Sequence, residues 1–381
     1  GTFGRGDGQF VQIRGVVVDK AANVYVGDTV NNRIQKFDEN GLFITKWGSF
    51  GSDNGQFLDP MDVASDSGGN IYIADTINHR VQKFSSEGMF LGRWGTFGSG
   101  DGQFRYPQGV AVDDSGYVYV TSSDLTHQRV QKFTFDGVFL ARWGSLGSGD
   151  GQFQNISGIV VDGAGNIFVA DRSNHRIQKF NSEGAFLLKW GSGGSSDGQF
   201  WNPRDVAADT LGNVYVVDRD NNRIQKFSSS GAFIAKWGSQ GAGDGSLNGP
   251  SGIAIDSHGN IYVSDTLNNR IQKFDGNGDF IHKFATYGQS IGTLNVPWGL
   301  SVANIGEIPH ISVVDRGNNR IQVFRELSEL PQSKAIVLAA GGPFPGNNLW
   351  DATQLCANFA YRTLTYQGFT KESIYYLSSN T

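Results

Sequence analysis

Short apolar stretches separated by polar turn residues follow one another along most of this chain, and the arrangement returns at a fixed interval. In one copy, the strand-like stretches cover residues 109–113, 117–121, 129–133 and 138–143, with turns rich in Gly and Asp between them. Stretches of about five residues bounded by Gly, Asp or Asn predict β-strands. No segment of this region shows a helical period. Each copy is therefore expected to form four antiparallel strands.

A cassette of the form Arg-[Ile/Val]-Gln-[Lys/Val]-Phe marks every copy. Four strands that repeat every 40 to 50 residues are typical of the blades of a β-propeller, which closes into a ring. The pattern predicts an all-β propeller over residues 1–327, with seven blades favoured because the cassette occurs seven times. Six blades stay open, because the fourth strand, which ends in Trp or Phe, occurs six times. The arginines of the cassettes, spaced 47 to 50 residues apart, are Arg33, Arg80, Arg129, Arg176, Arg223, Arg270 and Arg320.

The first residues match the interior of a copy, as residues 95–104 show. We therefore expect the strand that completes the last blade to precede Gly1 in a longer protein. The repeat resembles the NHL family through triplets such as Asn78-His79-Arg80 and Asn31-Asn32-Arg33, over roughly residues 1–325. That resemblance implies a propeller scaffold, which in the family usually closes with six blades. Some eukaryotic NHL domains bind RNA.

Composition narrows the classes of partner. The net charge is −5 and the sequence pI is about 5.7, so the chain lacks the basic character typical of nucleic-acid binding. No run of eighteen apolar residues exists, so no membrane span is expected. With 53 Gly and only 18 % charged residues, the composition fits a turn-rich β protein. One cysteine, Cys356, excludes an intramolecular disulfide.

An aspartate precedes each cassette arginine by five residues. An Asp and an Arg that flank one hairpin loop can pair with each other and with loop amides, and sevenfold recurrence indicates a structural rather than a catalytic role. We expect these pairs to be Asp28–Arg33, Asp75–Arg80, Asp124–Arg129, Asp171–Arg176, Asp218–Arg223, Asp265–Arg270 and Asp315–Arg320.

Two loops differ between copies, and the strand order places both on one face. They are the loop leading into the first strand and the loop that joins the second and third strands. A constant frame with one variable rim is how a scaffold presents a binding site, and Arg and Trp suit contact hot spots. Drift on an exposed rim is the alternative. The candidate binding residues are Arg14, Met61, Asp62, Gln108, Arg172, Arg204, Asp205, Arg219, Trp298 and Arg316. Among them, Asp62 and Asp205 replace a Gly of the other copies, and we expect their removal to abolish binding with little change in thermal stability.

From Lys334 the pattern changes. A strand over residues 335–340, a helix from Asn347 or Asn348 to about Leu364, and a strand over 373–377 predict a β-α-β unit. The segment resembles the start of legumain-like and caspase-like cysteine peptidases, through the run from Lys334 to Pro343 and Asn347-Asn-Leu-Trp-Asp351. The family's catalytic His and Cys follow later strands, beyond Thr381, and Cys356 lies on the apolar stripe of the helix. We therefore divide the chain into a propeller (1–327), a linker (328–333) and the opening of an α/β domain (334–381), with no catalytic residue.

The leading hypothesis is a non-catalytic recognition propeller of a secreted or surface bacterial protein, which binds a protein, peptide or glycan on its variable face. Its signal peptide is expected outside these residues. One alternative is a metal-dependent propeller enzyme of lyase or lactonase type, although no His occupies a first strand and we expect no metal or cofactor. The other is a structural protein that self-associates through the incomplete last blade or the C-terminal segment.

Overall fold

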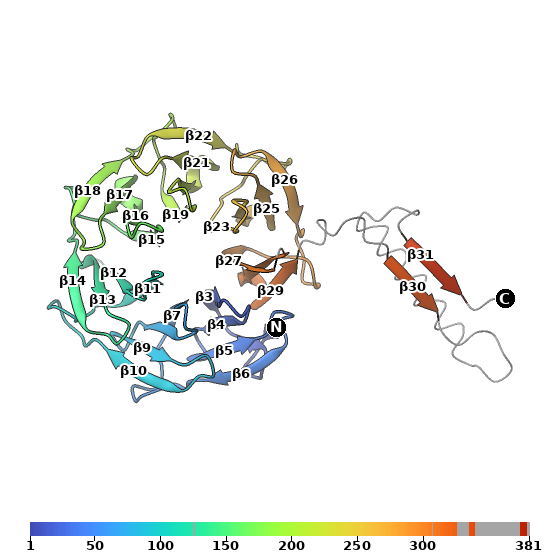
Figure 1. Cartoon of the computed structure of the whole chain (residues 1–381), viewed down its shortest axis with the longest axis horizontal. Helices are drawn as coiled ribbons and strands as arrows, with labels where there is room; N and C mark the ends of the chain where they lie inside the picture. Colours follow the sequence, from blue (N-terminus) through green and yellow to red (C-terminus); the bar gives the residue numbers. More distant parts are fainter. Residues whose placement is uncertain (125, 307, 326–334, 340–373, 379–381) are drawn as a thin grey trace. The chain divides into compact units, whose positions relative to one another are not determined.

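The computed structural model describes residues 1–124, 126–306, 308–325, 335–339 and 374–378. The chain divides into two compact units, Gly1–Arg325 and Glu326–Thr381. The first unit is a β-propeller of seven blades arranged in a ring (Figure 1). Seven blades are therefore confirmed, and the alternative of six is wrong because each of the seven cassettes lies in a sheet of its own.

The strands of each blade run outward from the axis in chain order (Figure 1). The innermost strands are β3 (Ile13–Val18), β7 (Pro60–Ser65), β11 (Pro107–Val112), β15 (Ile156–Val161), β19 (Pro203–Ala208), β23 (Ile253–Ile255) and β27 (Pro297–Ile305). The second strands are β4 (Val24–Asp28), β8 (Ile71–Asp75), β12 (Val118–Ser123), β16 (Ile167–Asp171), β20 (Val214–Asp218), β24 (Ile261–Asp265) and β28 (Ile308–Asp315).

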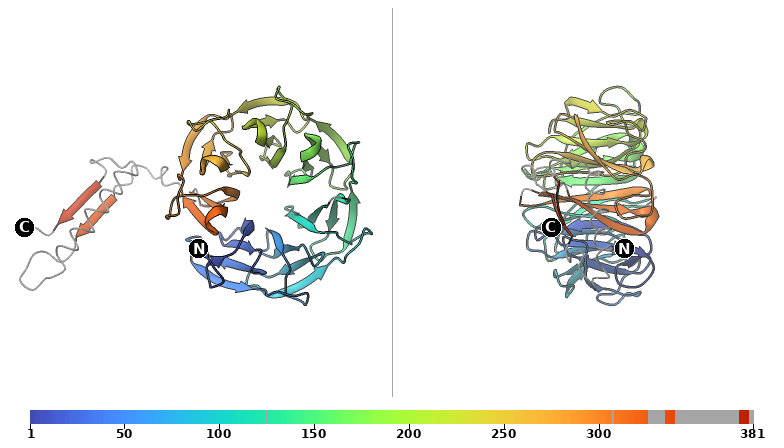
Figure 2. Two further views of the ribbon diagram at one scale, coloured as in Figure 1. Left: turned by 180° about the vertical axis from the view of Figure 1, so that it is seen from behind. Right: turned by 90° about the vertical axis from the view of Figure 1, so that its right-hand side faces the viewer.

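The cassettes form the third strands, which are β5 (Arg33–Phe37), β9 (Arg80–Phe84), β13 (Gln128–Phe133), β17 (Arg176–Phe180), β21 (Arg223–Phe227), β25 (Arg270–Phe274) and β29 (Arg320–Arg325). Six blades have a fourth, outer strand: β6 (Phe43–Trp47), β10 (Phe90–Trp94), β14 (Phe139–Trp143), β18 (Phe186–Trp190), β22 (Phe233–Trp237) and β26 (Phe280–Phe284). The seventh sheet contains only β27, β28 and β29 among the described residues. The ring closes where β3 packs against β27 and β28 (Figure 2).

Three smaller features complete the described chain. β1 (Thr2–Phe3) pairs in parallel with β2 (Gln9–Phe10) ahead of the first blade. Single 3-10 turns follow four second strands: η1 (Arg172–Asn174), η2 (Arg219–Asn221), η3 (Thr266–Asn268) and η4 (Arg316–Asn318). In the second unit, β30 (Ala335–Ala339) pairs in parallel with β31 (Ile374–Ser378), as a β-α-β unit requires. The predicted helix and Cys356 lie outside the described residues.

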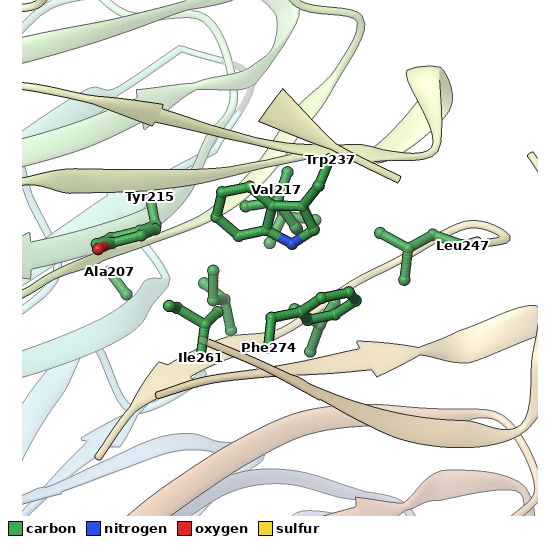
Figure 3. Packing of buried hydrophobic residues seen from close by; sticks show 10 residues of the cluster. Ala207, Tyr215, Val217, Trp237, Leu247, Ile261 and Phe274 are labelled. Carbon is green, nitrogen blue, oxygen red and sulfur yellow. The ribbon is translucent and has the colours of Figure 1, made fainter. Parts of the chain in front are cut away.

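The hydrophobic core lies between neighbouring blades. Trp237 of β22 packs on Phe274 of the next blade, with ring centroids 5.9 Å apart, and on Tyr215 at 6.1 Å (Figure 3). Gly278, in the turn before β26, has φ +93°, and a Cβ there would lie 2.4 Å from the Trp237 ring. The recurring Trp, Phe and Gly of the repeat are thus explained by one contact, which is found at five of the junctions between neighbouring blades.

Candidate functional site

The Asp and Arg of the repeat form a buried network in six blades. In the first, Arg33 Nε donates to Asp28 Oδ2 at 2.7 Å, and Asp28 is fully buried. Three further guanidinium hydrogens are donated to the carbonyls of Arg5, Gly6 and Gln9, in the segment that precedes the first strand. This network ties the hairpin to the loop that leads into the blade, so its role is structural. The same Nε–Oδ2 bond, 2.6–2.7 Å long, joins Asp75–Arg80, Asp171–Arg176, Asp218–Arg223, Asp265–Arg270 and Asp315–Arg320.

The third blade departs from this pattern and corrects the expected Asp124–Arg129 pair. Strand register places Ser122 opposite Arg129, whereas Asp124 lies beyond the strand and accepts backbone N–H groups of Thr126 and His127. The cause is the two-residue insertion, which lengthens this loop so that the residue five before the arginine no longer faces it. In the described part of the chain, Arg129 Nε is buried without a hydrogen-bond partner, and burial lowers the pKa of Arg129.

The candidate binding residues converge on the central channel. A cavity of about 600 Å³ is lined by residues of six blades. Arg172 and Arg219 are not part of the lining, but both lie close enough for their charges to act on Arg204. The predicted residues that line the cavity are Arg14, Met61, Asp62, Gln108, Arg204, Asp205, Trp298 and Arg316.

Sequence reasoning missed some lining residues. Thr121 and Asn155 also line the cavity. Thr121 occupies the second-strand position that is Gly27 in the first copy and Ala74 in the second. This position therefore differs between copies and could have been found in the sequence. It lies within a strand, however, whereas the candidate residues were taken from the two variable loops.

Asp62 and Asp205 join adjacent blades across the channel wall. Asp62 accepts the N–H of Val63 at 3.0 Å and that of Val110, in the next blade, at 3.0 Å. Asp205 accepts the N–H of Val206 at 2.9 Å and that of Ile253, in the next blade, at 3.2 Å. The two carboxylates therefore line the channel and also link neighbouring blades. We therefore revise the expectation that both carboxylates can be removed with little change in thermal stability.

Burial also perturbs these carboxyl groups. Desolvation raises the pKa of Asp62 to about 7 and that of Asp205 to about 6, although the backbone hydrogen bonds oppose the shift. The charge of Asp205 adds to the increase in the pKa of Asp62. Both groups therefore change protonation in the neutral to mildly acidic range.

Arginines gather on one side of the channel around Trp298. The guanidinium carbons of Arg204 and Arg316 lie 4.5 and 4.6 Å from the centre of its ring, within cation–π distance. Burial, together with the charges of Arg172, Arg219 and Arg316, lowers the pKa of Arg204 to about 10. The arrangement can hold an anionic or planar group, and the apolar side chain of Met61 also lines the cavity.

The channel does not resemble a metal site. Within residues 1–124, 126–306 and 308–325, together with the two C-terminal strands, no group of three or more His, Cys, Asp and Glu could hold a metal ion. No helix in the described part of the chain has the length and apolar character needed to cross a membrane.

Four segments of the chain match the NHL repeat: residues 57–84, 153–180, 200–227 and 247–274. No curated protein matches the chain. Among solved structures, a virginiamycin B lyase from Staphylococcus aureus is 15 % identical, with a TM-score of 0.60 over 81 % of this chain and 93 % of that one. A streptogramin B lyase is also 15 % identical, with a TM-score of 0.63 over 85 % and 96 %.

Hydrazine synthase from Kuenenia stuttgartiensis is 10 % identical, with a TM-score of 0.62 over 85 % of this chain and 99 % of that one. At such identities the likeness concerns the propeller fold alone. Each matched segment runs from the end of a connecting loop to the end of a cassette and so covers the first three strands of one blade. The four segments belong to the second, fourth, fifth and sixth blades. The chain thus carries four NHL repeats within a seven-bladed β-propeller.

Proposed function

We propose that this propeller is a recognition module that binds a protein, peptide or glycan at the channel face. One observation carries the proposal: residues that differ between copies line one and the same cavity, whereas recurring residues stabilise each hairpin and pack neighbouring blades together. A scaffold that keeps its frame constant and varies one face is suited to binding. A secreted or surface location is part of this proposal.

Exposed aromatic side chains on the same face support the proposal. The loops that connect each outer strand to the next blade carry Phe50, Phe97 and Tyr287, which are 73 %, 57 % and 70 % exposed. Trp201 is 48 % exposed on an equivalent loop. Aromatic side chains at a polar rim are typical of protein contacts.

Panning of displayed random peptides and a glycan array against the propeller tests the proposal. Met61→Ser with Gln108→Ser introduces the residue that the fourth and sixth copies carry at this position, Ser157 and Ser251. We expect the double variant to bind the selected ligands about tenfold more weakly, because these hot-spot positions line the cavity.

The matched control is Met89→Ser with Leu211→Ser, which removes exposed apolar side chains from turns on the opposite face. We expect this control to bind like the unaltered protein. Equal weakening by both variants, or the selection of no ligand from either library, would overturn the proposal.

The incomplete seventh blade favours self-association as a second candidate. The third strands of five other blades are buried at every residue, whereas four of the six residues of β29 are half-buried and Arg325 is exposed. No strand pairs with the outer edge of β29 within the described residues. An open strand edge can take a strand from a second copy. Light scattering that shows a strict monomer at all concentrations would exclude this candidate.

We further propose that the C-terminal segment opens a caspase-like or legumain-like domain. The parallel pairing of β30 with β31 supports a β-α-β unit. Restoring the residues that follow Thr381 in the full gene tests the proposal: peptidase activity that depends on a downstream Cys is the expected result, and a downstream sequence without His and Cys would contradict it.

A further inference from the structure

The residue that follows the second-strand Asp ties neighbouring blades together in three copies. It is a buried Thr, whose hydroxyl donates to the carbonyl of a Pro that begins the first strand of the next blade. Such a buried bond between blades stabilises the ring. The bonds run from Thr29 to Pro60 at 3.0 Å, from Thr76 to Pro107 at 2.7 Å and from Thr266 to Pro297 at 2.8 Å.

In three other copies an arginine stands at this position. Arg172, Arg219 and Arg316 each begin a 3-10 turn, η1, η2 and η4. Among residues 1–124, 126–306 and 308–325, none of the three side chains makes a hydrogen bond to a neighbouring blade. In the fourth blade, Ser157 donates to the carbonyl of Pro203 at 2.9 Å and so replaces the Thr bond, whereas no such bond is found in the fifth and seventh blades within the described residues. All three blades carry a cation at the channel face. A structural role alone does not explain such an exchange.

The cations lie close together. The turn η2, which begins with Arg219, contacts β19, the innermost strand of the fifth blade, to which Arg204 belongs. The turn η4, which begins with Arg316, contacts β27, the strand of Trp298. The charges of Arg172, Arg219 and Arg316 all act on Arg204. Trp298 holds Arg204 and Arg316 by cation–π contacts and so orients both guanidinium groups. The four side chains form what we call the arginine cluster.

The arginine cluster has little internal neutralisation. In the part of the chain that the structure describes, Arg172, Arg204 and Arg316 lie within 4 Å of no carboxylate, although the whole chain has a net charge of −5. The carboxylate of Asp205, which neighbours Arg204, already accepts two backbone N–H groups. The charge of Asp205 raises the pKa of Arg204, but by less than burial and the repulsion from Arg172 and Arg219 lower it.

Arg219 adds an independent observation. Within the described residues, its one carboxylate contact is to Asp220 of the same turn, at 3.6 Å through Nη1. Its Nε atom is buried and has no hydrogen-bond acceptor among the residues that the structure describes. A buried donor without an acceptor is costly, and a bound oxygen would satisfy it.

We propose that the arginine cluster binds the carboxylates of an acidic peptide segment, an inference that rests on the proposed recognition function. Guanidinium groups match carboxylates in bidentate geometry. The cations come from three blades, so a segment with several separated carboxylates can reach more of them than one compact anion can. The apolar side chains of Met61 and Trp298 line the same cavity and offer contacts to the rest of such a segment.

Fluorescence anisotropy with labelled synthetic peptides tests the inference. The probe is a peptide of alternating Glu and Ala, compared with the isosteric Gln peptide and with a phosphoserine peptide of the same spacing. We expect the Glu peptide to bind at least about tenfold more tightly than the Gln peptide, and binding to weaken as salt is added.

The variant combines Arg172→Thr, Arg219→Thr and Arg316→Thr, which introduces the residue of the first, second and sixth copies. Its matched control combines Arg93→Thr, Arg142→Thr and Lys189→Thr, exposed residues of the outer strands β10, β14 and β18. Both lose three positive charges. We expect the first to bind the Glu peptide about thirtyfold more weakly and the control to change affinity by less than about threefold.

The outcomes separate the inference from the function on which it rests. Equal binding of Glu and Gln peptides, equal loss in both variants, or far tighter binding of the phosphoserine peptide would overturn the assignment to carboxylates. If the Glu peptide fails to bind while peptides selected by panning do bind, the assignment to carboxylates is also wrong. The recognition function is then still supported. If neither the synthetic nor the panned peptides bind, the recognition function itself is wrong.

Discussion

Ser122 lies directly opposite Arg129 in the third blade, at the register position where the other six blades place an aspartate. Arg129 still donates to the carbonyls of Ser99 and Gln103, as its counterparts do to their loops. Its Nε, however, has no acceptor. The third blade therefore keeps the bonds from the arginine to the loop carbonyls but lacks the bond to a carboxylate.

Ser122→Asp is expected to stabilise the propeller. The new carboxylate would accept a hydrogen bond from Arg129 Nε. In the second blade, Asp75 also accepts the N–H of Leu58 and the side-chain amide of Gln82. The equivalent groups in the third blade are the N–H of residue 105 and the amide of Gln131, which would face the new carboxylate. A hydrogen bond to a charged group contributes about 1.5–3 kcal/mol, so the melting temperature should rise by roughly 2–4 °C. Ser123→Asp, one residue away, is the control and should not stabilise. A lower melting temperature for Ser122→Asp would contradict this reading of the register.

The reverse change, Asp171→Ser, gives the fourth blade the arrangement of the third. It removes the partner of Arg176 and leaves a buried guanidinium without its carboxylate. Loss of one partner from a buried pair costs about 3–5 kcal/mol. Denaturant unfolding should show this loss as a lower midpoint. Asp150→Ser, which removes an exposed carboxylate paired with Lys189, should cost less than about 1 kcal/mol. Equal effects of the two changes would argue against a structural role for the buried network.

Arg219→Thr should weaken binding of the Glu peptide while leaving stability unchanged or higher. The threonine can donate to the carbonyl of Pro250, as Thr76 does to Pro107, and the change removes one positive charge near Arg204. We expect a gain of about 0.5–1.5 kcal/mol in the free energy of unfolding. Thr76→Val, measured alongside, should lose a similar amount. Destabilisation by Arg219→Thr would show that the arginine has a structural role instead.

The ionisation of Asp62 should make stability fall as the pH rises. Its pKa is raised to about 7 in the folded protein, mainly by desolvation, from 3.8 in the unfolded chain. The folded state therefore binds the proton of Asp62 more tightly than the unfolded chain does. This difference stabilises the protein fully below about pH 4, and the stabilisation is lost as the pH rises through about 7.

The comparison with Asp62→Asn isolates this effect. Between about pH 5 and about pH 8, the free energy of unfolding of the unaltered protein, relative to that of the variant, should fall by roughly 1–2 kcal/mol. This fall is smaller than the full pKa shift of Asp62 implies, because water in the channel screens the charge. Denaturant unfolding at several pH values measures it. A difference that does not change with pH would mean that Asp62 has an ordinary pKa.

Much of the candidate site was predictable because the repeats served as controls for one another. Comparison of copies singled out Arg204, Asp205 and Trp298, and topology alone placed the two variable loops on one face. What could not be predicted was the distance of each side chain from the axis. The same loop position puts Arg316 into the cavity lining but leaves Arg172 outside it.

The sequence by itself determined the strands and their order, because turn residues and short apolar stretches are local signals that repeat along the chain. It favoured seven blades and left six open, and the tertiary structure decided the number. It could not determine that Ser122, and not Asp124, faces Arg129, since an insertion changes the register only through pairing across the hairpin. Nor could it show that Asp62 and Asp205 hydrogen-bond to the next blade. Those contacts join residues 48 positions apart, and only the packing of one blade against the next brings such residues together.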